Sequence, residues 1–316
     1  MIMFSGKTRP VEKLKQILER QQYRVVGGHS AVKICYWTKE SLRAGRVCYK
    51  ELWYPPVESH RCMQMTPYLG CNYHCSHCWR LHSGDRNIEW KEFPFTKKLD
   101  EPREIVEGCV EKRSELLMGF KGNPNVDKKK FDEALRPRMM TMSLTGEPTL
   151  YPRTGELVEE AKRRGMIAFL VTNGSLPKRL EEIDPLPWQL YVSVYGPDPK
   201  THYEIARPET PKAWDRLNKT LELLPSLETR KVVRLTMIKG CNMKDPEGYS
   251  KLIEKAEPNF VEVKAYEWVG ESQRRLPREA MPWMEDVRGF AREISIHTGY
   301  EIGGEFEPSG VVLLTA

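Results

Sequence analysis

The sequence predicts an α/β fold, an open partial TIM barrel of six βα units with extensions at both ends. Short apolar stretches alternate with amphipathic stretches along most of the chain, a pattern that favours a parallel sheet covered by helices. Six units make up three quarters of the eight-fold barrel. In addition, a cysteine-rich loop directly follows the first expected strand. Barrel enzymes carry their active sites at that edge of the sheet, so the loop is expected to carry the chemistry.

The barrel is expected to occupy residues 61–270. Its strands are expected over residues 61–69, 139–144, 166–171, 189–194, 232–238 and 260–268. The helices that connect and follow them are expected over residues 101–120, 155–164, 178–182, 199–206, 212–224, 246–256 and 282–298.

Two extensions flank the barrel. Residues 1–60 are expected to contain one amphipathic helix over 10–22, followed by an irregular, aromatic-rich segment over 23–60. Residues 271–316 are expected to form a C-terminal helix and tail.

The composition is that of a globular chain with a heavily charged surface. Of its 316 residues, 40% are hydrophobic and 30% are charged, and 50 basic against 44 acidic residues give a net charge of +6. Local basic runs make a polyanionic partner plausible without requiring one. These runs lie at residues 128–130, 136–138, 162–164 and 274–275.

The sequence predicts no membrane segment, because it has no apolar stretch of about 20 residues. Residues 1–6 are too short and too polar in their flanks for a secretion signal, so we expect a cytoplasmic location. In such a chain, eight cysteines favour metal binding or catalysis over disulfides.

Cys71, Cys75 and Cys78 form the most informative motif of the chain, with spacings of three and then two residues. Three thiolates can hold three corners of a 4Fe-4S cluster and leave one iron free to bind a cofactor or substrate. Structural zinc sites also use closely spaced cysteines, and they are the alternative. The missing second pair and the barrel context favour the iron-sulfur cluster.

This spacing resembles the signature of the radical S-adenosylmethionine (radical SAM) enzymes, whose fold is a partial barrel of the predicted kind. These enzymes carry a Gly-Gly-Glu-like turn after their second strand, which holds the methionine end of SAM. Here Thr145, Gly146 and Glu147 stand at that place, and Thr145 replaces the first glycine. The resemblance implies that Asn173 and Ser193, at the ends of the third and fourth strands, contact the ribose or carboxylate of SAM. A turn-capping role is the alternative for both residues.

Cys35, Cys48 and Cys62 precede the triplet in a segment with little apolar periodicity. Three cysteines there suggest a second cluster that would hold the segment together, and buried thiols are the alternative. Cys109, in an expected helix, and Cys241, just after a strand, are most simply packing cysteines.

This arrangement resembles the 4-demethylwyosine synthases, radical SAM enzymes of wybutosine biosynthesis, over nearly the whole chain. The resemblance lies in the cysteine pattern, in Lys50 two residues after Cys48, and in residues 53–56, 79–80, 143–151 and 263–270. It implies a carbon-carbon lyase with two 4Fe-4S clusters and SAM as cofactors and pyruvate as co-substrate.

The substrate implied by the resemblance is N1-methylguanosine beside the anticodon of tRNA-Phe. In the family, the reduced cluster passes an electron to SAM, and a 5′-deoxyadenosyl radical takes a hydrogen from the N-methyl group. The carbon radical adds to C2 of pyruvate, carbon 1 is lost, and the guanine amine closes the third ring.

Lys50 matches the family lysine proposed to form a Schiff base with pyruvate. The open iron of the second cluster is expected to hold the pyruvate carboxylate. A solvated surface lysine is the alternative.

The expected partners are the tRNA-Phe anticodon loop and a separate electron donor such as flavodoxin or ferredoxin. The resemblance is to the archaeal form, which has no flavodoxin-like domain, and a monomer is expected. Candidate RNA contacts are the basic runs and residues 273–278.

Two other functions stay open at the level of the sequence. One is another two-cluster radical SAM enzyme that acts on a peptide or protein, and the other is a zinc-stabilised RNA-binding module. The upstream position of the extra cysteines favours the tRNA enzyme.

Overall fold

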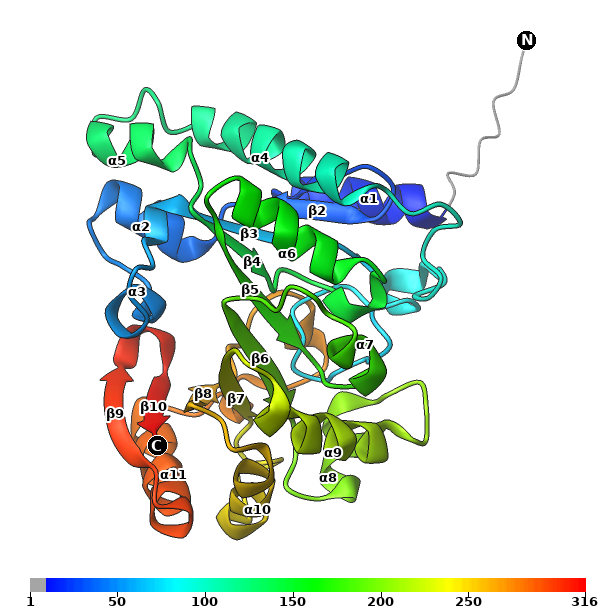
Figure 1. The fold of residues 1–316 in the computed structure, drawn as a ribbon, viewed down its shortest axis with the longest axis vertical. Coiled ribbons are helices and arrows are strands. Elements are labelled where there is room, and N and C mark those ends of the chain that lie inside the picture. The colour runs from blue at the N-terminus through cyan, green and yellow to red at the C-terminus, as the bar shows by residue number, and fades with distance from the viewer. Residues whose placement is uncertain (1–9) are drawn as a thin grey trace.

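A computed structural model describes residues 10–316, and a single ten-stranded sheet forms its centre (Figure 1). The strand order is β1-β2-β3-β4-β5-β6-β7-β8-β10-β9. The six strands from β3 to β8 are parallel and follow one another in chain order. They are β3 (Cys62–Thr66), β4 (Met139–Met142), β5 (Ile167–Thr172), β6 (Gln189–Val194), β7 (Arg230–Met237) and β8 (Phe260–Ala265). Strands β3 and β8 pair with flanking strands instead of with each other, so the predicted open (βα)6 barrel is confirmed.

Helices connect the parallel strands along the outer side of the sheet (Figure 1). They are α4 (Pro102–Met118), α5 (Lys128–Ala134), α6 (Thr154–Arg163), α7 (Pro177–Glu181), α8 (Pro199–Ala206), α9 (Ala213–Leu223) and α10 (Pro246–Ala256), and α11 (Met284–Thr298) follows β8. Only α5 was not predicted. It begins in the basic run at Lys128, and the Asp127 side chain caps it by accepting a hydrogen bond from the backbone N–H of Lys130 at 3.0 Å.

The alternation within each strand divides the core from the barrel interior. In β6, Leu190 and Val192 pack into the main apolar core that the helices cover, whereas Tyr191 and Ser193 face the other side. All six residues of β6 are buried, as expected for a parallel strand covered on both faces. The interior face is therefore where polar and aromatic side chains collect.

The prediction of an irregular segment over residues 23–60 is wrong. The segment contains β1 (Arg24–Val26), β2 (Ser30–Lys33), α2 (Tyr36–Arg43) and α3 (Tyr49–Trp53), after α1 (Pro10–Arg20). Strand β2 pairs antiparallel with β3 and extends the sheet. These elements are too short to show a periodic pattern, and contacts with distant residues stabilise them. Residues 1–9 of the expected 1–60 extension lie outside the described residues, and the division into 1–60, 61–270 and 271–316 stays a prediction.

The C-terminal segment contains two strands where a tail was expected, β9 (Glu301–Phe306) and β10 (Val311–Thr315). Strand β10 pairs antiparallel with β8, and β9 forms the edge of the sheet. The sequence of β9, with adjacent glycines at 303 and 304, gives no strand signal. Within residues 10–316, no helix is both long and apolar enough to cross a membrane.

Candidate active site

One cavity of about 340 Å³ lies inside the barrel and opens at the C-terminal ends of the parallel strands. Every residue predicted from the sequence to be catalytic, to bind SAM or to bind a cluster lines this cavity: Cys35, Cys48, Lys50, Cys62, Cys71, Cys75, Cys78, Thr145, Gly146, Glu147, Asn173 and Ser193. Segments far apart in the chain therefore meet at one place, where chemistry is expected in a barrel.

The cluster loop, residues 70–79, follows β3 and is fixed on its outer side by α8. The backbone N–H of Ser76 donates to the Ile205 carbonyl at 2.9 Å, and that of His74 donates to the Ala206 carbonyl at 3.1 Å. These bonds hold the loop over the barrel mouth, with its cysteines directed to the cavity.

A buried ion pair fixes the inner side of the cluster loop. The Arg80 guanidinium contacts the Glu92 carboxylate at 3.0 Å, and both side chains are almost fully buried. Glu92 also accepts a hydrogen bond from the backbone N–H of Cys71 at 3.1 Å. Replacing either residue would leave the other as an unpaired buried charge. Both Arg80 and Glu92 are therefore needed to keep the loop in this conformation. The sequence gives no signal for Glu92, because its partners Cys71 and Arg80 lie 21 and 12 residues earlier in the chain, outside any local pattern.

Two thiols of the triplet, those of Cys71 and Cys75, are weak acids on their own. Burial raises the pKa of Cys71 to about 12 and the pKa of Cys75 well above its usual value. All eight cysteines are free thiols. Because metal binding deprotonates thiols and stabilises the thiolates, a metal cluster fits this triplet, in which Cys71 and Cys75 are buried and Cys78 is partly buried.

Gly146 brings the backbone after β4 directly against the cluster loop. Its φ is +72°, and an added Cβ would lie 2.0 Å from the Tyr68 carbonyl oxygen and 2.7 Å from that of Gly70. Only glycine is compatible with this conformation and this close approach. The turn predicted to hold the methionine end of SAM is therefore placed beside the triplet.

Glu147 joins the ends of two strands. Its buried carboxylate accepts hydrogen bonds from Thr172 Oγ1 at 2.7 Å, from the Asn173 N–H at 2.8 Å and from the Thr149 N–H at 3.0 Å. Burial raises its pKa, and these donors oppose that effect. A contact of this carboxylate with the SAM ammonium group stays a prediction.

Asn173 links the third parallel strand to the cluster loop. Its Nδ2 donates to Asn72 Oδ1 at 3.0 Å and lies 3.9 Å from Cys71 Sγ. Its Oδ1 accepts from the Ser175 N–H at 3.0 Å, so it also caps a turn. Ser193 is buried and faces the cavity from β6. Contacts of Asn173 and Ser193 with SAM stay predictions.

Two polar groups in the wall of the cavity fit a polar ligand. Within residues 10–316, His77 Nδ1 and the Tyr73 hydroxyl are buried and have no hydrogen-bond partner. Burial, together with the charge of Arg275, lowers the pKa of His77 to about 4, so its ring is neutral. Since buried polar atoms are rarely left unpaired, these two fit the polar groups of a ligand such as SAM.

The upstream cysteines reach the deeper part of the same cavity from three elements. Cys35 and Cys48 are the residues that precede α2 and α3, and Cys62 is the first residue of β3. Burial raises the pKa of Cys48 to about 12 and that of Cys62 to about 11. Like the triplet, they form a set of three thiols that line the cavity and that a metal cluster would stabilise.

A buried cation beside these cysteines supports an anionic group at this place. Arg113 is fully buried and donates to the carbonyls of His60 at 2.8 Å and Cys62 at 3.1 Å. Among residues 10–316 it has no ion pair with a carboxylate. Burial lowers its pKa to about 10, and nearby Cys62 and Cys35 oppose this. A buried cation is costly without a counter-charge, and a cluster held by three thiolates would provide one.

Lys50 is not a surface lysine. Its Nζ lies 4.4 Å from the ring centroid of Tyr191 and 4.7 Å from that of Phe169, inside the barrel. Burial and the nearby charge of Arg234 lower its pKa.

Helix α3, which carries Lys50, is fixed to the bottom of the barrel by Glu262. This carboxylate is fully buried in β8 and accepts hydrogen bonds from Tyr49 at 3.0 Å and Tyr54 at 2.9 Å. Arg234 of β7 pairs with it at 2.7 Å and lines the cavity. Neither charged residue was predicted from the sequence. A charge in the middle of an apolar parallel strand is the signal that marks them.

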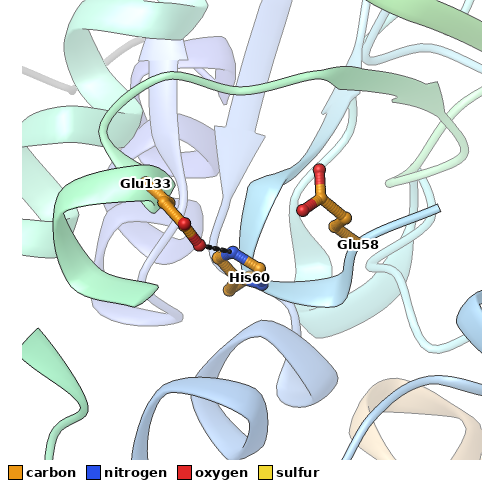
Figure 2. A group of neighbouring side chains, drawn as sticks. All are labelled: Glu58, His60 and Glu133. Carbon is orange, nitrogen blue, oxygen red and sulfur yellow. Dashed lines mark hydrogen bonds and ion pairs between the residues drawn. The ribbon is translucent and has the colours of Figure 1, made fainter. Parts of the chain in front are cut away.

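A further group of metal-binding residue types lies around the start of β3. Figure 2 shows Glu58, His60 and Glu133, with His60 Nε2 at 2.8 Å from Glu133 Oε2. Each carboxylate also pairs with a cation, Glu58 with Arg61 at 3.3 Å and Glu133 with Lys129 at 3.9 Å. We interpret the group as an ion-pair network that holds α5 against the segment before Cys62.

Two known protein families match consecutive parts of this chain. Residues 65–253 match the Radical SAM superfamily, and residues 255–316 match a family described as wyosine base formation. The chain is therefore a radical SAM enzyme with an additional C-terminal region.

A relative from Pyrococcus abyssi is an S-adenosyl-L-methionine-dependent tRNA 4-demethylwyosine synthase. It is 48% identical over 308 residues, which cover 96% of this chain and 88% of the relative. A relative from Pyrococcus horikoshii with the same name has the same identity and coverage. The chain belongs to the family of tRNA 4-demethylwyosine synthases.

Solved structures agree with this assignment. A structure described as TYW1 with a lysine-pyruvate adduct bound superposes with a TM-score of 0.86 and 32% identity, and the match covers 96% of this chain and 95% of that one. A crystal structure of archaeal TYW1 gives a TM-score of 0.78 at 30% identity with the same coverage. The family assignment, the fold and the enzyme class predicted from the sequence are thus confirmed. The zinc-stabilised module and the peptide-acting enzymes are set aside.

Proposed function

We propose that this chain condenses N1-methylguanosine beside the anticodon of tRNA-Phe with pyruvate to form 4-demethylwyosine. The observation that carries the proposal is the single cavity that both cysteine groups and the Lys50 amine line. The relatives are named for this product, and a related structure carries a lysine-pyruvate adduct.

The part of the cavity beside the cluster loop would bind SAM. A 4Fe-4S cluster held by Cys71, Cys75 and Cys78, with SAM, would supply a 5′-deoxyadenosyl radical that removes a hydrogen atom from the substrate. The close approach at Gly146 brings the turn of Thr145, Gly146 and Glu147 beside the cluster loop, where it would contact the methionine end of SAM. Asn173 and Ser193 would orient the rest of the molecule from the neighbouring strands.

The part of the cavity beside the upstream cysteines and Lys50 would bind pyruvate. Cys35, Cys48 and Cys62 would hold a second 4Fe-4S cluster, which would supply an open coordination position for the carboxylate. The Lys50 amine would attack C2 of pyruvate, so that a carbon-nitrogen double bond forms and the ketone oxygen leaves as water. The aromatic rings of Tyr191 and Phe169 keep this amine inside the barrel.

Electrons would come from a separate protein such as flavodoxin or ferredoxin, and the enzyme would act as a monomer. A tRNA substrate supports a cytoplasmic location for this activity.

Turnover tests the proposal directly. Iron-loaded protein is mixed anaerobically with tRNA-Phe carrying N1-methylguanosine, SAM, pyruvate and dithionite, and digested RNA is analysed by mass spectrometry. We expect the tricyclic nucleoside together with 5′-deoxyadenosine. The control is the same tRNA without the methyl group, which offers no hydrogen to remove and should give no tricyclic base. If the methylated tRNA stays unchanged while SAM is cleaved, the substrate assignment is wrong.

Replacing Cys35, Cys48 and Cys62 together with Ala tests the second cluster. The loaded protein is expected to bind about eight irons and the variant about four, since each group would hold one four-iron cluster. SAM cleavage should persist without coupling, and the tricyclic product should disappear because pyruvate loses its binding position. Iron analysis and product assays measure both effects.

The matched control is Cys241→Ala, which removes a half-buried cysteine that does not line the cavity. It should keep all iron and normal product. Unchanged iron in the triple variant would remove the second cluster from the proposal.

A further inference from the structure

An exposed tryptophan, which is not part of the apolar core, lies at the mouth of the cavity. The Trp79 side chain is 44% exposed and lines the cavity directly after the last cysteine of the triplet. A single exposed indole is common on a protein surface, but this one stands at the mouth of the candidate active site, where its aromatic face is placed to contact an entering ligand.

The backbone of Trp79 is held rigidly by the segment after β8. The Glu271 N–H donates to the Trp79 carbonyl at 3.1 Å. An added Cβ on Gly270 would lie 2.5 Å from that same oxygen, so the two segments touch. Arg275 donates to the neighbouring Cys78 carbonyl at 2.8 Å and to that of Arg80 at 3.0 Å. The indole is therefore presented by a fixed backbone.

Two guanidinium groups are anchored beside it. Arg86 and Arg274 both pair with Glu271, whose side chain is only 2% exposed, while theirs are 40% and 69% exposed. The buried carboxylate fixes one side of each guanidinium and leaves the other donors free for an anion outside the protein.

We propose that Trp79, Arg86 and Arg274, together called the rim patch, form a docking surface for a single-stranded RNA loop. The inference rests on the proposed function and names the surface that its RNA substrate uses. A base that enters the cavity must leave the stack of its loop. Trp79 then stacks on a neighbouring base, and the two arginines contact phosphates on either side.

An acidic electron-donor protein is the other partner that the positive charges could bind. The RNA loop is favoured because the indole stands at the edge of the cavity that must admit a base. A donor protein needs only to come close to the cluster and has no use for a stacking surface at that edge.

The test measures the affinity of the iron-loaded protein for a synthetic anticodon stem-loop RNA that carries N1-methylguanosine. We expect Trp79→Ala to weaken binding about 10-fold, the scale of one lost base-aromatic stack, and Trp79→Phe to stay within about 3-fold of the parent. Arg274→Ala should reduce the slope of log Kd against log salt by about 1.

Matched controls lie on other parts of the surface. Trp283→Ala removes an indole that is 64% exposed but does not line the cavity, and Arg103→Ala removes an exposed arginine paired with Glu107 on α4. Both should keep the parent affinity and salt slope. Iron content is measured for every variant, and Trp79→Phe keeps the test valid if the Ala variant loses its cluster.

Three results would overturn the inference. Parent affinity in both Trp79→Ala and Arg274→Ala would remove RNA from the rim patch while leaving the proposed function intact. Parent RNA affinity with slower cluster reduction by flavodoxin would assign the patch to the electron donor. A parent protein that neither binds nor modifies the stem-loop would overturn the proposed function and this inference together.

Discussion

Replacing Cys71, Cys75 and Cys78 together with Ala is expected to abolish SAM cleavage and to remove about four of about eight irons per chain. The reason is that the three thiols of the cluster loop line the cavity together, beside the close backbone approach at Gly146. Alanine offers no ligand at any of the three corners. Anaerobic reconstitution, iron analysis and detection of 5′-deoxyadenosine measure the two effects.

The cluster loop itself should survive this substitution. Its outer bonds to α8 use backbone groups, and the Arg80–Glu92 pair also does not depend on the thiols. Circular dichroism should therefore match the parent protein, and Cys241→Ala again serves as the control. If the triple variant still produces 5′-deoxyadenosine, the catalytic assignment of these cysteines is wrong.

The sequence predicted the parts of the site that depend on local patterns. The triplet, the turn at Gly146 and the polar residues Asn173 and Ser193 all lie where a strand ends. Parallel strands bring their C-terminal ends to one edge, so a correct strand order is enough to place these residues together. The structure confirms that they line one cavity.

The residues that hold the site in shape could not be predicted, because each is defined by a partner outside its own local sequence pattern. Glu92 acts through Arg80, Arg113 through the carbonyls before and within β3, and Glu262 through Tyr49. No local pattern separates a buried arginine or glutamate of this kind from a surface one. Of these residues, only Glu262 could have been recognised from the sequence, because a charged residue within an apolar strand indicates a buried charge.

The first and last parts of the described chain also depend on each other. Phe306 of β9 packs against Trp37 of α2 and Tyr49 of α3, with ring centroids 5.3 Å and 6.4 Å apart. Figure 1 shows the β9–β10 hairpin close to α3 at one side of the barrel. The region matched to wyosine base formation thus supports the two helices that begin after Cys35 and Cys48. We infer that this C-terminal region keeps the proposed pyruvate site in shape.

Replacing Lys50 with Ala is expected to keep both clusters and to lower product formation about 100-fold or more, because covalent activation of pyruvate is lost. Borohydride treatment with pyruvate should add a three-carbon mass to the Lys50 peptide of the parent protein and to no peptide of the variant. Lys50→Arg should fail as well, since a guanidinium stays protonated and cannot form the imine.

A second lysine in the same cavity provides a matched control for the Lys50 experiment. Lys264 of β8 also lines the cavity, but its ammonium group pairs with Glu267 and donates to the Ser309 carbonyl at 2.8 Å. The Lys50 amine instead lies against the rings of Tyr191 and Phe169, which offer no competing carboxylate. Lys264→Ala should therefore keep the adduct on Lys50. An adduct on Lys264, or normal product from Lys50→Ala, would contradict this assignment. Either result would show that Lys50 is not the amine that reacts with pyruvate.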